Sequence, residues 1–552
     1  MKYSKGMPRP AQPGELVALD VEVFGQAEPF HIPTGDFACL TVVYENGDRY
    51  MIEDTKDLPE TFERISQGLW CMHNALYDIA QLRRWATLKP HDLMDIMVFE
   101  RDMFGGYYDS FSLDALSRRY LNKALEKDIR EQFGAKTKMT KKMELYAIRD
   151  SDATVKIARC QLQEADKQGS PMRHYWEVDQ WAVWAFADME PAAINVEGWH
   201  NLADGFAVKG QEIEEELGFN VYSTDACKKV IYEVTGRRLS STNAKVVLEP
   251  MLEELEGDGY DLIQGILRAR SFRKATSTYG HLWPERWADE NGWVIPSWRV
   301  TGTETGRVAC RSPNLMNIPV RTMPEFRRMF ISKHDGGRIM VSDVQQQEPR
   351  ILAHFSQDQR LLEAFKQGLD IHQAVADRCG VERFMGKQIN LGLSYGLTPY
   401  GLARNAKISK VEAEKILREY FAQYRGVKAY MARERAKGYR QEKVHSALGR
   451  PVWLNLYARQ WQNNAVNSPI QSSAGDQTKL AIVKIWRETE SAGLPFGVCI
   501  NVHDEIVLDI LPGTTQKYRP IVNQAWTDAG KELFPDIPMV VDIKTGDSWG
   551  IK

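Results

Sequence analysis

Two aspartates, Asp343 and Asp504, stand where a carboxylate can bind a metal ion. Asp343 follows the apolar run 339–341 and precedes a short polar turn. Asp504 lies between His503 and Glu505, with apolar residues on both sides of the three. Two carboxylates carried by strands can share two cations that activate an attacking oxygen and stabilise a leaving one in phosphoryl transfer. The alternative for both aspartates is ordinary turn or cap chemistry.

A third stretch repeats functional side chains every four residues: Arg383, Lys387, Leu391 and Tyr395. On a helix this spacing places them on one face. The two cations can hold a triphosphate, and the aromatic ring can lie against a base or a sugar. The alternative is a solvated basic helix whose last turn packs in a core.

The N-terminal part of the sequence contains further acids in regular settings. Asp20 and Glu22 alternate with apolar residues, so both carboxylates lie on one face of a predicted strand. Asp78 stands at the start of a helical pattern, and Tyr146 and Asp150 lie one helical turn apart. Taken singly, each has a structural alternative: the polar face of an edge strand, a helix cap or first-turn acid, or the surface of an amphipathic helix.

Rigid elements must position these side chains. Residues 339–356 predict a strand, a turn and a helix, with Pro349 at the first helical position, where its missing N–H costs nothing. Residues 499–510 predict two strands that meet at a tight turn. Asp343 would then sit at the end of a buried strand and face a cleft.

Composition limits the class of protein. The 552 residues are too many for one core, so several domains are expected. A net charge of -3 does not indicate a nucleic-acid partner, so any DNA-binding surface must be a local groove of positive charge. The seven cysteines form no CxxC pair, which argues against a disulfide framework or a zinc site and fits a reducing cytosol. No apolar run is long enough to span a membrane.

Together, the three C-terminal stretches resemble family A DNA polymerases, the class of bacterial repair polymerases and many phage replicases. Their order and separations along the chain agree with that family. The residues that carry the resemblance are Asp343, Glu348 and Arg350 in the first palm motif, Arg383, Lys387, Tyr395 and Gly396 in the fingers helix, and His503, Asp504 and Glu505 in the third motif.

The resemblance implies roles for individual residues. Asp343 and Asp504 would be the catalytic, metal-binding acids, and Glu348 would crowd the 2′ position of the sugar. Arg307 would reach into the minor groove, where contacts sense pair geometry more than sequence; a surface residue in a glycine-rich turn is its alternative. The implied nucleotide-binding residues are Glu348, Arg383, Lys387, Leu391, Tyr395 and Gln347, and the implied DNA contacts are Arg307, Asn467, Gln471 and His503.

Five positions depart from the family pattern. Leu391 stands where the family usually has Phe or Tyr, and Gln347 and Pro349 stand where it usually has aliphatic residues. Val344 replaces a common Tyr, and Asn463 occupies a position often taken by Arg. These departures leave the two-metal chemistry intact but can alter base, sugar or analogue preference.

Residues 15–167 resemble the DEDD-type 3′–5′ proofreading exonuclease that accompanies family A polymerases. Such a site needs clustered acids to hold two metals around a scissile phosphate. Tyr146 would orient the attacking water. The nuclease is expected to be intact because all four implied metal ligands are present: Asp20, Glu22, Asp78 and Asp150.

The implied fold class is a multidomain α/β chain. An RNase H-like exonuclease domain is followed by a right-hand polymerase with an antiparallel palm sheet and a helical thumb and fingers. The expected boundaries are a flexible lead at 1–14, the exonuclease domain at 15–174, the thumb at 175–285, the first part of the palm at 286–356, the fingers at 357–446 and the second part of the palm at 447–552.

The resemblance implies a DNA-templated DNA polymerase with proofreading that uses two Mg²⁺ per active site, with Mn²⁺ as a substitute. Its expected partners are primer–template DNA and deoxynucleoside triphosphates, with replication accessory proteins as further candidates and no membrane. The sequence shows no 5′-nuclease domain before the exonuclease. This compact form resembles a phage replicase acting in the host cytoplasm, and a trimmed cellular enzyme is the alternative.

Two rival functions remain. A single-subunit RNA polymerase shares the palm acids and the fingers helix, but Glu348 argues against it because a ribonucleotide enzyme needs room there. The complete exonuclease motif also argues against it. The other rival is a non-catalytic DNA-binding or scaffolding protein, and the presence of all six metal-binding acids speaks against a decayed site.

Overall fold

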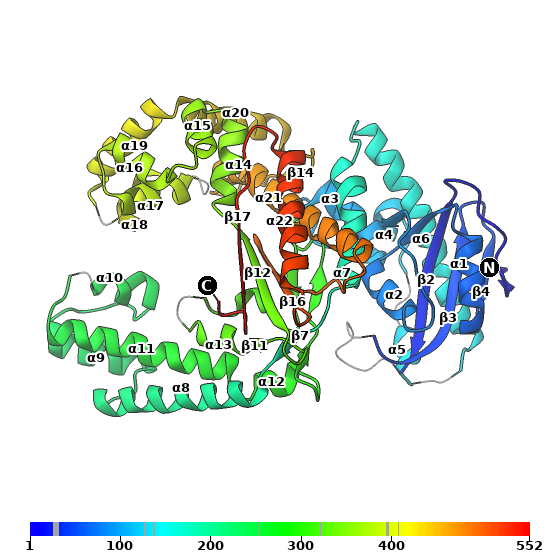
Figure 1. The fold of residues 1–552 in the computed structure, drawn as a ribbon, viewed down its shortest axis with the longest axis horizontal. Coiled ribbons are helices and arrows are strands. Elements are labelled where there is room, and N and C mark those ends of the chain that lie inside the picture. The colour runs from blue at the N-terminus through cyan, green and yellow to red at the C-terminus, as the bar shows by residue number, and fades with distance from the viewer. Residues whose placement is uncertain are drawn as a thin grey trace.

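The computed structural model describes residues 1–25, 33–125, 129–135, 138–252, 254–320, 323–393, 397–406 and 408–551. Two sheets organise the chain, one in its N-terminal part and one at the centre of its C-terminal part (Figure 1). Each of them carries acids singled out from the sequence.

The N-terminal part is built around a six-stranded mixed sheet with the strand order β1-β4-β3-β2-β5-β6. β2 lies inside this sheet, antiparallel to β3 and parallel to β5. Asp20 and Glu22 are half-buried between fully buried apolar neighbours on β2. The edge-strand alternative for these two acids is therefore wrong. The strands are β1 (Ser4–Lys5), β2 (Leu16–Phe24), β3 (Asp36–Tyr44), β4 (Arg49–Ile52), β5 (Leu69–Met72) and β6 (Leu93–Asp95).

Helices bring the other N-terminal acids beside β2. Asp78 lies in the first turn of α2 (Ala75–Leu82), after the N-cap residue Asn74, so Asp78 is not itself the cap. Tyr146 and Asp150 lie on α6, which packs along β2 and β3. The predicted helices are confirmed. The remaining helices of this part are α1 (Leu58–Arg64), α3 (Ile96–Phe104), α4 (Leu113–Leu121), α5 (Arg130–Ala135) and α6 (Lys141–Lys167).

A four-stranded antiparallel sheet, ordered β15-β16-β12-β17, forms the centre of the C-terminal part. The predicted strand, turn and helix over 339–356 are confirmed as β12 and α14. Pro349 is the third residue of α14 rather than its first, which the helix tolerates because its first N–H groups lack an intrahelical partner. The elements are β12 (Arg338–Val344), α14 (Gln347–Ser356), β15 (Val498–Val502), β16 (Glu505–Ile510) and β17 (Val541–Gly546).

Two long helices support this sheet. α22 (Thr515–Leu533) contacts β12 and β17, and the buried Trp526 on it donates its indole N–H to Ser342 Oγ at 3.1 Å. α21 (Trp461–Ser491) contacts both α22 and α14. This packing holds β12 and the start of α14 in place, and with them Asp343 and Glu348.

Two helical groups extend from the central sheet (Figure 1). In the first, α8 and α11 run side by side and bury a small hydrophobic cluster of their own together with α9. The mainly helical pattern expected for 175–285 is confirmed. Its principal helices are α7 (Gln180–Ala187), α8 (Val196–Leu217), α9 (Thr224–Thr235), α11 (Asp258–Tyr279) and α12 (Leu282–Trp287).

The second group contains the helix predicted from its four-residue spacing, α17, which packs against α16. Two helices of this group begin with an aspartate as N-cap. Asp358 accepts hydrogen bonds from backbone N–H groups at the start of α15, and Asp370 does the same at the start of α16. The helices are α15 (Gln359–Lys366), α16 (Ile371–Cys379), α17 (Arg383–Leu393), α18 (Pro399–Ala406), α19 (Lys410–Gln423) and α20 (Arg425–Gln441).

Among the described residues, no helix is both long enough and apolar enough to cross a membrane.

Candidate active sites

Asp343 lies near the end of β12, where the neighbouring strands carry acids too. Its Cα is paired with that of Glu505 in β16 and that of Asp542 in β17. Arg327 compensates the charge of Glu505, since its Nη1 donates to Oε1 at 2.9 Å and both side chains are 3% exposed. The same Oε1 accepts the indole N–H of Trp549 at 2.7 Å. This sheet end therefore concentrates acids but fixes one of them to a buried arginine.

Asp504 lies in the two-residue turn between β15 and β16, and the predicted tight turn is confirmed. His503, the other turn residue, adopts left-handed backbone with φ 57°. Burial raises the pKa of Asp504, and the carboxylates Glu505 and Glu348 raise it further, while Arg307 lowers it. Val344, at the end of β12, donates its backbone N–H to the Asp504 carbonyl. The turn therefore lies against the strand that carries Asp343.

Arg307 and Glu348 form an ion pair beside this turn. Nη2 of Arg307 donates to Glu348 Oε1 at 2.6 Å, and its Nε donates to the Gln471 carbonyl at 3.2 Å. Burial lowers the pKa of His503, and the charge of Arg307 lowers it further. The structure thus gathers three of the predicted DNA contacts and the predicted sugar contact around Asp504.

Gln347 joins α14 to α21. Its side chain is 4% exposed, and its Nε2 donates to Gln477 Oε1 at 3.0 Å and to the Ala474 carbonyl at 3.3 Å, both on α21. Its predicted contact with the nucleotide stays a prediction.

Asn467 lies one helical turn before Gln471 on α21 and is buried. Its Oδ1 has no hydrogen-bond partner among the residues that the structure describes. A buried acceptor left in this state is costly unless a ligand supplies a donor. The side chain of Asn467 thus suits contact with a bound molecule.

The second helical group contributes cations from α17. Arg383 and Lys387 are exposed, and both charges act on His372, which lies in α16 and whose pKa is lowered mainly by burial. Arg383 Nε donates to Asp370 Oδ2 at 2.7 Å, so this cation is partly compensated within the group. The backbone of Leu391 is part of α17. Tyr395 lies outside the described residues.

The N-terminal acids gather in one place. Asp78 is 3% exposed, and burial raises its pKa well above the ordinary range, with Asp20, Asp95 and Glu22 raising it further. Among the main influences on the pKa of Asp78, only the hydrogen bond from the backbone N–H of Val21 lowers it. The site is therefore an acid cluster in which like charges repel one another.

Tyr146 lies in the same cluster. Burial raises the pKa of its phenol, and the carboxylates Asp150, Glu22 and Asp20 raise it further. The phenol is therefore neutral at ordinary pH and keeps its proton as a hydrogen-bond donor. Since these acids come from β2 and α6 and act on one ring, the structure brings together the residues that the sequence singled out separately.

Comparison with known proteins decides the family. Residues 200–551 match the family model described as DNA polymerase family A, and residues 39–163 match one described as 3′–5′ exonuclease. The chain belongs to DNA polymerase family A. Its exonuclease domain contains the acid cluster of β2, α2 and α6, and its polymerase domain contains Asp343 and Asp504.

Curated relatives agree with this placement. The chain is 29% identical over 442 residues to DNA polymerase I of Pseudomonas aeruginosa. This match covers 73% of this chain and 47% of the relative. It is 34% identical over 331 residues to DNA polymerase I of Caldicellulosiruptor bescii, covering 56% of this chain and 37% of the relative. The chain thus spans half or less of the length of these relatives.

A solved structure shows the same fold. It is the POL domain of Pol1 from M. smegmatis in complex with DNA primer-template and dNTP, with a TM-score of 0.82, 23% identity and 99% of each chain covered. The predicted fold class, an exonuclease domain followed by a right-hand polymerase, is confirmed.

The exonuclease acids fit divalent cations. Asp78 Oδ2 is buried and has no hydrogen-bond partner in the part of the chain that the structure describes. Carboxylate oxygens are the ligands that hard cations such as Mg²⁺ prefer, and a cation would relieve the repulsion described above. In that same described part, no group of three or more acidic, His or Cys side chains encloses an ion by itself. Substrate phosphates and water would therefore complete the coordination, as is usual for Mg²⁺.

A buried ionic network, which no local sequence pattern predicts, joins the exonuclease domain to the polymerase domain. Arg450 of the polymerase domain pairs with Asp102 of the exonuclease domain, with Asp179 and with Asp476, where its Nη2 lies 2.7 Å from Oδ1. Lys479 also pairs with Asp179, and all five side chains are at most 1% exposed. Arg450 and Lys479 hold the pKa of Asp179 low, whereas burial raises that of Asp102.

Proposed function

We propose that this chain extends the 3′ end of a DNA primer along a template and removes mispaired nucleotides with its exonuclease domain. The observation that supports this most strongly is the position of Asp343 and Asp504 at adjoining ends of β12 and the β15–β16 turn, in a chain of DNA polymerase family A. The clustering of acids in a separate domain supports the second activity.

In the polymerase domain, Asp343 and Asp504 hold the cations. When bound, divalent cations favour the primer 3′-oxygen as nucleophile and offset charge at the α-phosphate. Arg383 and Lys387 of α17 bind the triphosphate, each as a cation on an exposed helix face. Glu348 lies against the sugar and leaves no space for a 2′-hydroxyl.

Other residues of this domain position the strands. His503 steadies the primer end, and Arg307, Asn467 and Gln471 bind the duplex. The buried Oδ1 of Asn467 and the closeness of Arg307 to Asp504 support these roles. Two further residues, Leu391 and Tyr395, shape the nucleotide pocket.

In the exonuclease domain, Asp20, Glu22, Asp78 and Asp150 hold the cations around the scissile phosphate. Tyr146 orients the attacking water. Its position among the carboxylates Asp150, Glu22 and Asp20 supports this role, because a phenol can donate a hydrogen bond there. Mg²⁺ is the proposed ion at both sites, two per site, and Mn²⁺ is the proposed substitute.

The biological setting is also part of the proposal. Primer–template DNA and deoxynucleoside triphosphates are the substrates, replication accessory proteins are candidate partners, and the cytoplasm is the location. Replication of a phage genome in its host is the process. The domain boundaries stay as expected from the sequence.

Primer extension with Mg²⁺ tests the function. With deoxynucleotides the primer should lengthen, and without them it should shorten from the 3′ end. Extension by ribonucleotides at a comparable rate would favour the RNA polymerase alternative. Binding of DNA with neither lengthening nor shortening would favour the non-catalytic alternative.

A further inference from the structure

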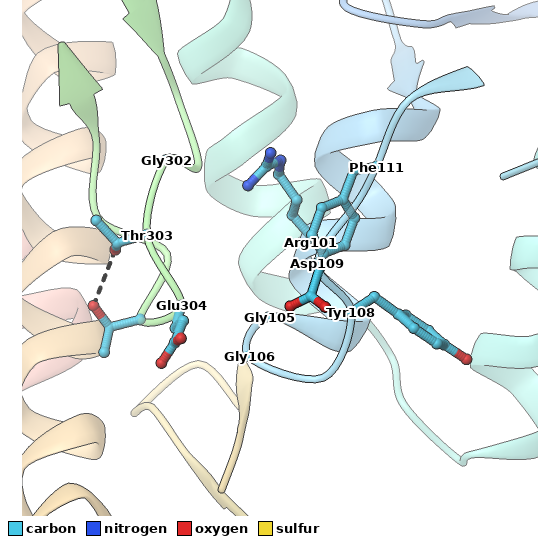
Figure 2. A pocket seen from close by; sticks show the side chains of 10 residues that line it. Arg101, Gly105, Gly106, Tyr108, Asp109, Phe111, Gly302, Thr303 and Glu304 are labelled. Carbon is cyan, nitrogen blue, oxygen red and sulfur yellow. Dashed lines mark hydrogen bonds between the residues drawn. The ribbon is translucent and has the colours of Figure 1, made fainter. Parts of the chain in front are cut away.

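The loop 301–307 of the polymerase domain, which ends at Arg307, rests on the exonuclease domain. Figure 2 shows this loop beside Gly105 and Gly106, which directly follow α3. The two segments line a hollow of about 530 Å³. Because open space lies beside the loop, its contacts with the exonuclease domain decide where it lies.

Gly105 approaches the loop so closely that a larger residue has no room. A Cβ added at Gly105 would lie 2.8 Å from the carbonyl oxygen of Glu304 and 2.9 Å from that of Arg101, which belongs to α3. Both oxygens are backbone atoms, so neither can move aside as the end of a flexible side chain can. Gly105→Ala would therefore push the loop away from α3.

The exonuclease segment beneath the loop is itself held in place. Trp453 of β14 (Pro451–Trp453) donates its backbone N–H to the Gly105 carbonyl at 3.1 Å and its indole N–H to the Met103 carbonyl at 2.8 Å. Gly106 adopts φ 85°, and a Cβ there would lie 2.9 Å from the Trp453 carbonyl oxygen. Residues 105–106 thus give the loop a fixed support.

A second connection runs through Arg450. A Cβ at Gly306 would lie 2.6 Å from Arg450 Nε, so the guanidinium packs directly against the loop. Gly306 adopts φ 73°, a left-handed backbone that favours glycine. Arg450 is bound to Asp102 of the exonuclease domain, and Asp102 Oδ1 also accepts the hydroxyl of Thr301 at 3.4 Å. One exonuclease carboxylate thus reaches the loop both directly and through Arg450.

Hydrogen bonds within the loop determine the position of Arg307. Thr303 Oγ1 accepts the backbone N–H of Arg307 at 3.0 Å, and Gly302 donates its N–H to the Arg307 carbonyl at 2.9 Å. Arg307 also packs against α21, since a Cβ at Gly475 would lie 3.0 Å from its Cγ. A shift of the loop therefore moves Arg307, and with it the guanidinium that is paired with Glu348.

We propose, building on the proposed function, that Gly105, Gly106 and Asp102 of the exonuclease domain position Arg307 for primer extension. They are positioning residues, because they act through the loop and through Arg450. Arg307 lies beside Asp504, so a displaced loop would misplace its guanidinium next to the reacting groups. The exonuclease domain thus contributes to extension without using its own acids.

Gly105→Ala tests the contact from the exonuclease side. It should lower kcat/KM for extension of a matched primer by roughly tenfold, since a small misplacement of a contact residue is costly. Degradation of a single-stranded oligonucleotide should be unchanged, because the acids lie on β2, α2 and α6. Gly134→Ala is the matched control: Gly134 is an exposed glycine of α5, and a Cβ there would have no described atom within 4 Å.

A double-mutant cycle with Arg307→Ala separates positioning from a general loss of structure. Arg307→Ala removes the side chain that Gly105 is proposed to position. In that background, Gly105→Ala should slow extension by less than about twofold further, because the two changes act on one interaction. A general disturbance of the polymerase domain would instead multiply the two effects. Extension rates are compared at equal concentrations of folded chain, measured by thermal melting.

Thr301→Val is a milder change at the same contact and serves if Gly105→Ala does not fold. It removes the hydroxyl that Asp102 accepts and should slow extension about threefold, again only when Arg307 is present. Thr301→Ser keeps the hydroxyl and should restore most of the rate.

Parent-like extension by folded Gly105→Ala and Thr301→Val chains would overturn the inference. Equal losses in the parent and Arg307→Ala backgrounds would overturn it as well, since the contact would then not act through Arg307. An unchanged rate in Arg307→Ala alone would contradict the proposed role of Arg307 itself, and the inference would fall with that role.

Discussion

Asp78 of the exonuclease domain lies among carboxylates, whereas Asp504 and Glu505 of the polymerase domain each have an arginine nearby. Asp78 is buried among carboxylates that all raise its pKa. Asp504 is buried as well, but Arg307 opposes the effect of Glu348 and Glu505 on its pKa. Arg327 likewise pairs with Glu505. The two sites thus differ in whether a basic side chain lies near the buried carboxylate.

The difference teaches how each site meets its substrate. The exonuclease cluster takes all its ligands from three neighbouring elements, β2, α2 and α6, and needs a cation to relieve its repulsion. The proposed polymerase site would combine the ends of β12 and the β15–β16 turn with cations from α17, which lies in a separate helical group (Figure 1). The proposed exonuclease site draws on one domain, whereas the proposed polymerase site draws on several parts of the chain.

The largest expected effect is the separation of the two activities. Asp504→Ala should lower primer extension by more than about a hundredfold, because it removes charge stabilisation at the reacting phosphate, and should leave primer degradation intact. Asp78→Ala should do the reverse. Both rates are measured on the same labelled primer–template, with and without deoxynucleotides.

Asp335→Ala is the control for this pair, since Asp335 is an exposed acid of the polymerase domain and should change neither rate. Loss of both activities from either single change, in a chain that still folds, would show that the two sites are not independent.

A smaller effect is expected at the Arg307–Glu348 pair. Glu348→Ala should raise the ratio of ribonucleotide to deoxynucleotide kcat/KM by roughly tenfold, or about 1.4 kcal/mol, because space opens at the sugar 2′ position. Arg307→Ala removes the other half of the ion pair without removing the carboxylate. It should slow extension and leave the sugar ratio near that of the parent chain.

If Arg307→Ala relaxed sugar choice as much as Glu348→Ala, the ion pair itself, and not the position of the carboxylate, would set the selectivity. An unchanged ratio in Glu348→Ala would remove Glu348 from this role.

A smaller change still is expected at Leu391, on the helix that the polymerase site takes from the second helical group. Leu391 offers no hydrogen-bond donor, so the chain should discriminate against dideoxynucleotides. Leu391→Tyr adds a donor worth about 1 kcal/mol and should raise the ratio of dideoxy to deoxy kcat/KM roughly fivefold. Overpacking can slow both substrates, but the ratio cancels much of that loss. A flat or lower ratio would mean that position 391 does not face the sugar.

The smallest effect is on stability and concerns the exonuclease domain alone. The raised pKa of Asp78 means that the folded, metal-free chain favours the protonated form. Ionisation of Asp78 therefore lowers the free energy of unfolding as pH rises above the usual pKa of an aspartate. Asp78→Asn should therefore raise the melting temperature by a few degrees in chelator, and more at about pH 8 than at about pH 5.

Scanning calorimetry of the metal-free chain makes the comparison, with Asp504→Asn as the matched variant. Its gain should be smaller because Arg307 already offsets part of the repulsion. A larger gain from Asp504→Asn would reverse the electrostatic ranking of the two sites.

Local patterns predicted the elements well because their signals lie within a few residues. The alternation in β2, the tight turn at His503 and Asp504, and the helical spacing in α17 all appear in the structure where they were expected. The four exonuclease acids could be assigned to a strand and two helices in the same way. Their gathering into one cluster followed only from the resemblance, since no local pattern specifies which elements pack together.

Pairings between distant residues could not be predicted. Gln347 donates to Gln477 on α21, 130 positions later, and its neighbours in sequence give no sign of this contact. Arg450 and Asp102 are 348 positions apart, and each resembles an ordinary surface charge in its own segment. Long-range burial decides such cases, and a single sequence does not show it.

The buried ionic network around Arg450 bears on how firmly the exonuclease domain is attached to the polymerase domain. Separating the exonuclease domain from the polymerase domain would strip Arg450 of Asp102 in a dry interior, and breaking one such buried pair typically costs roughly 3–5 kcal/mol. An exonuclease domain that moved away from the polymerase domain would lose this free energy each time it moved. The buried pair of Arg450 with Asp102 therefore favours an arrangement in which the two domains stay docked.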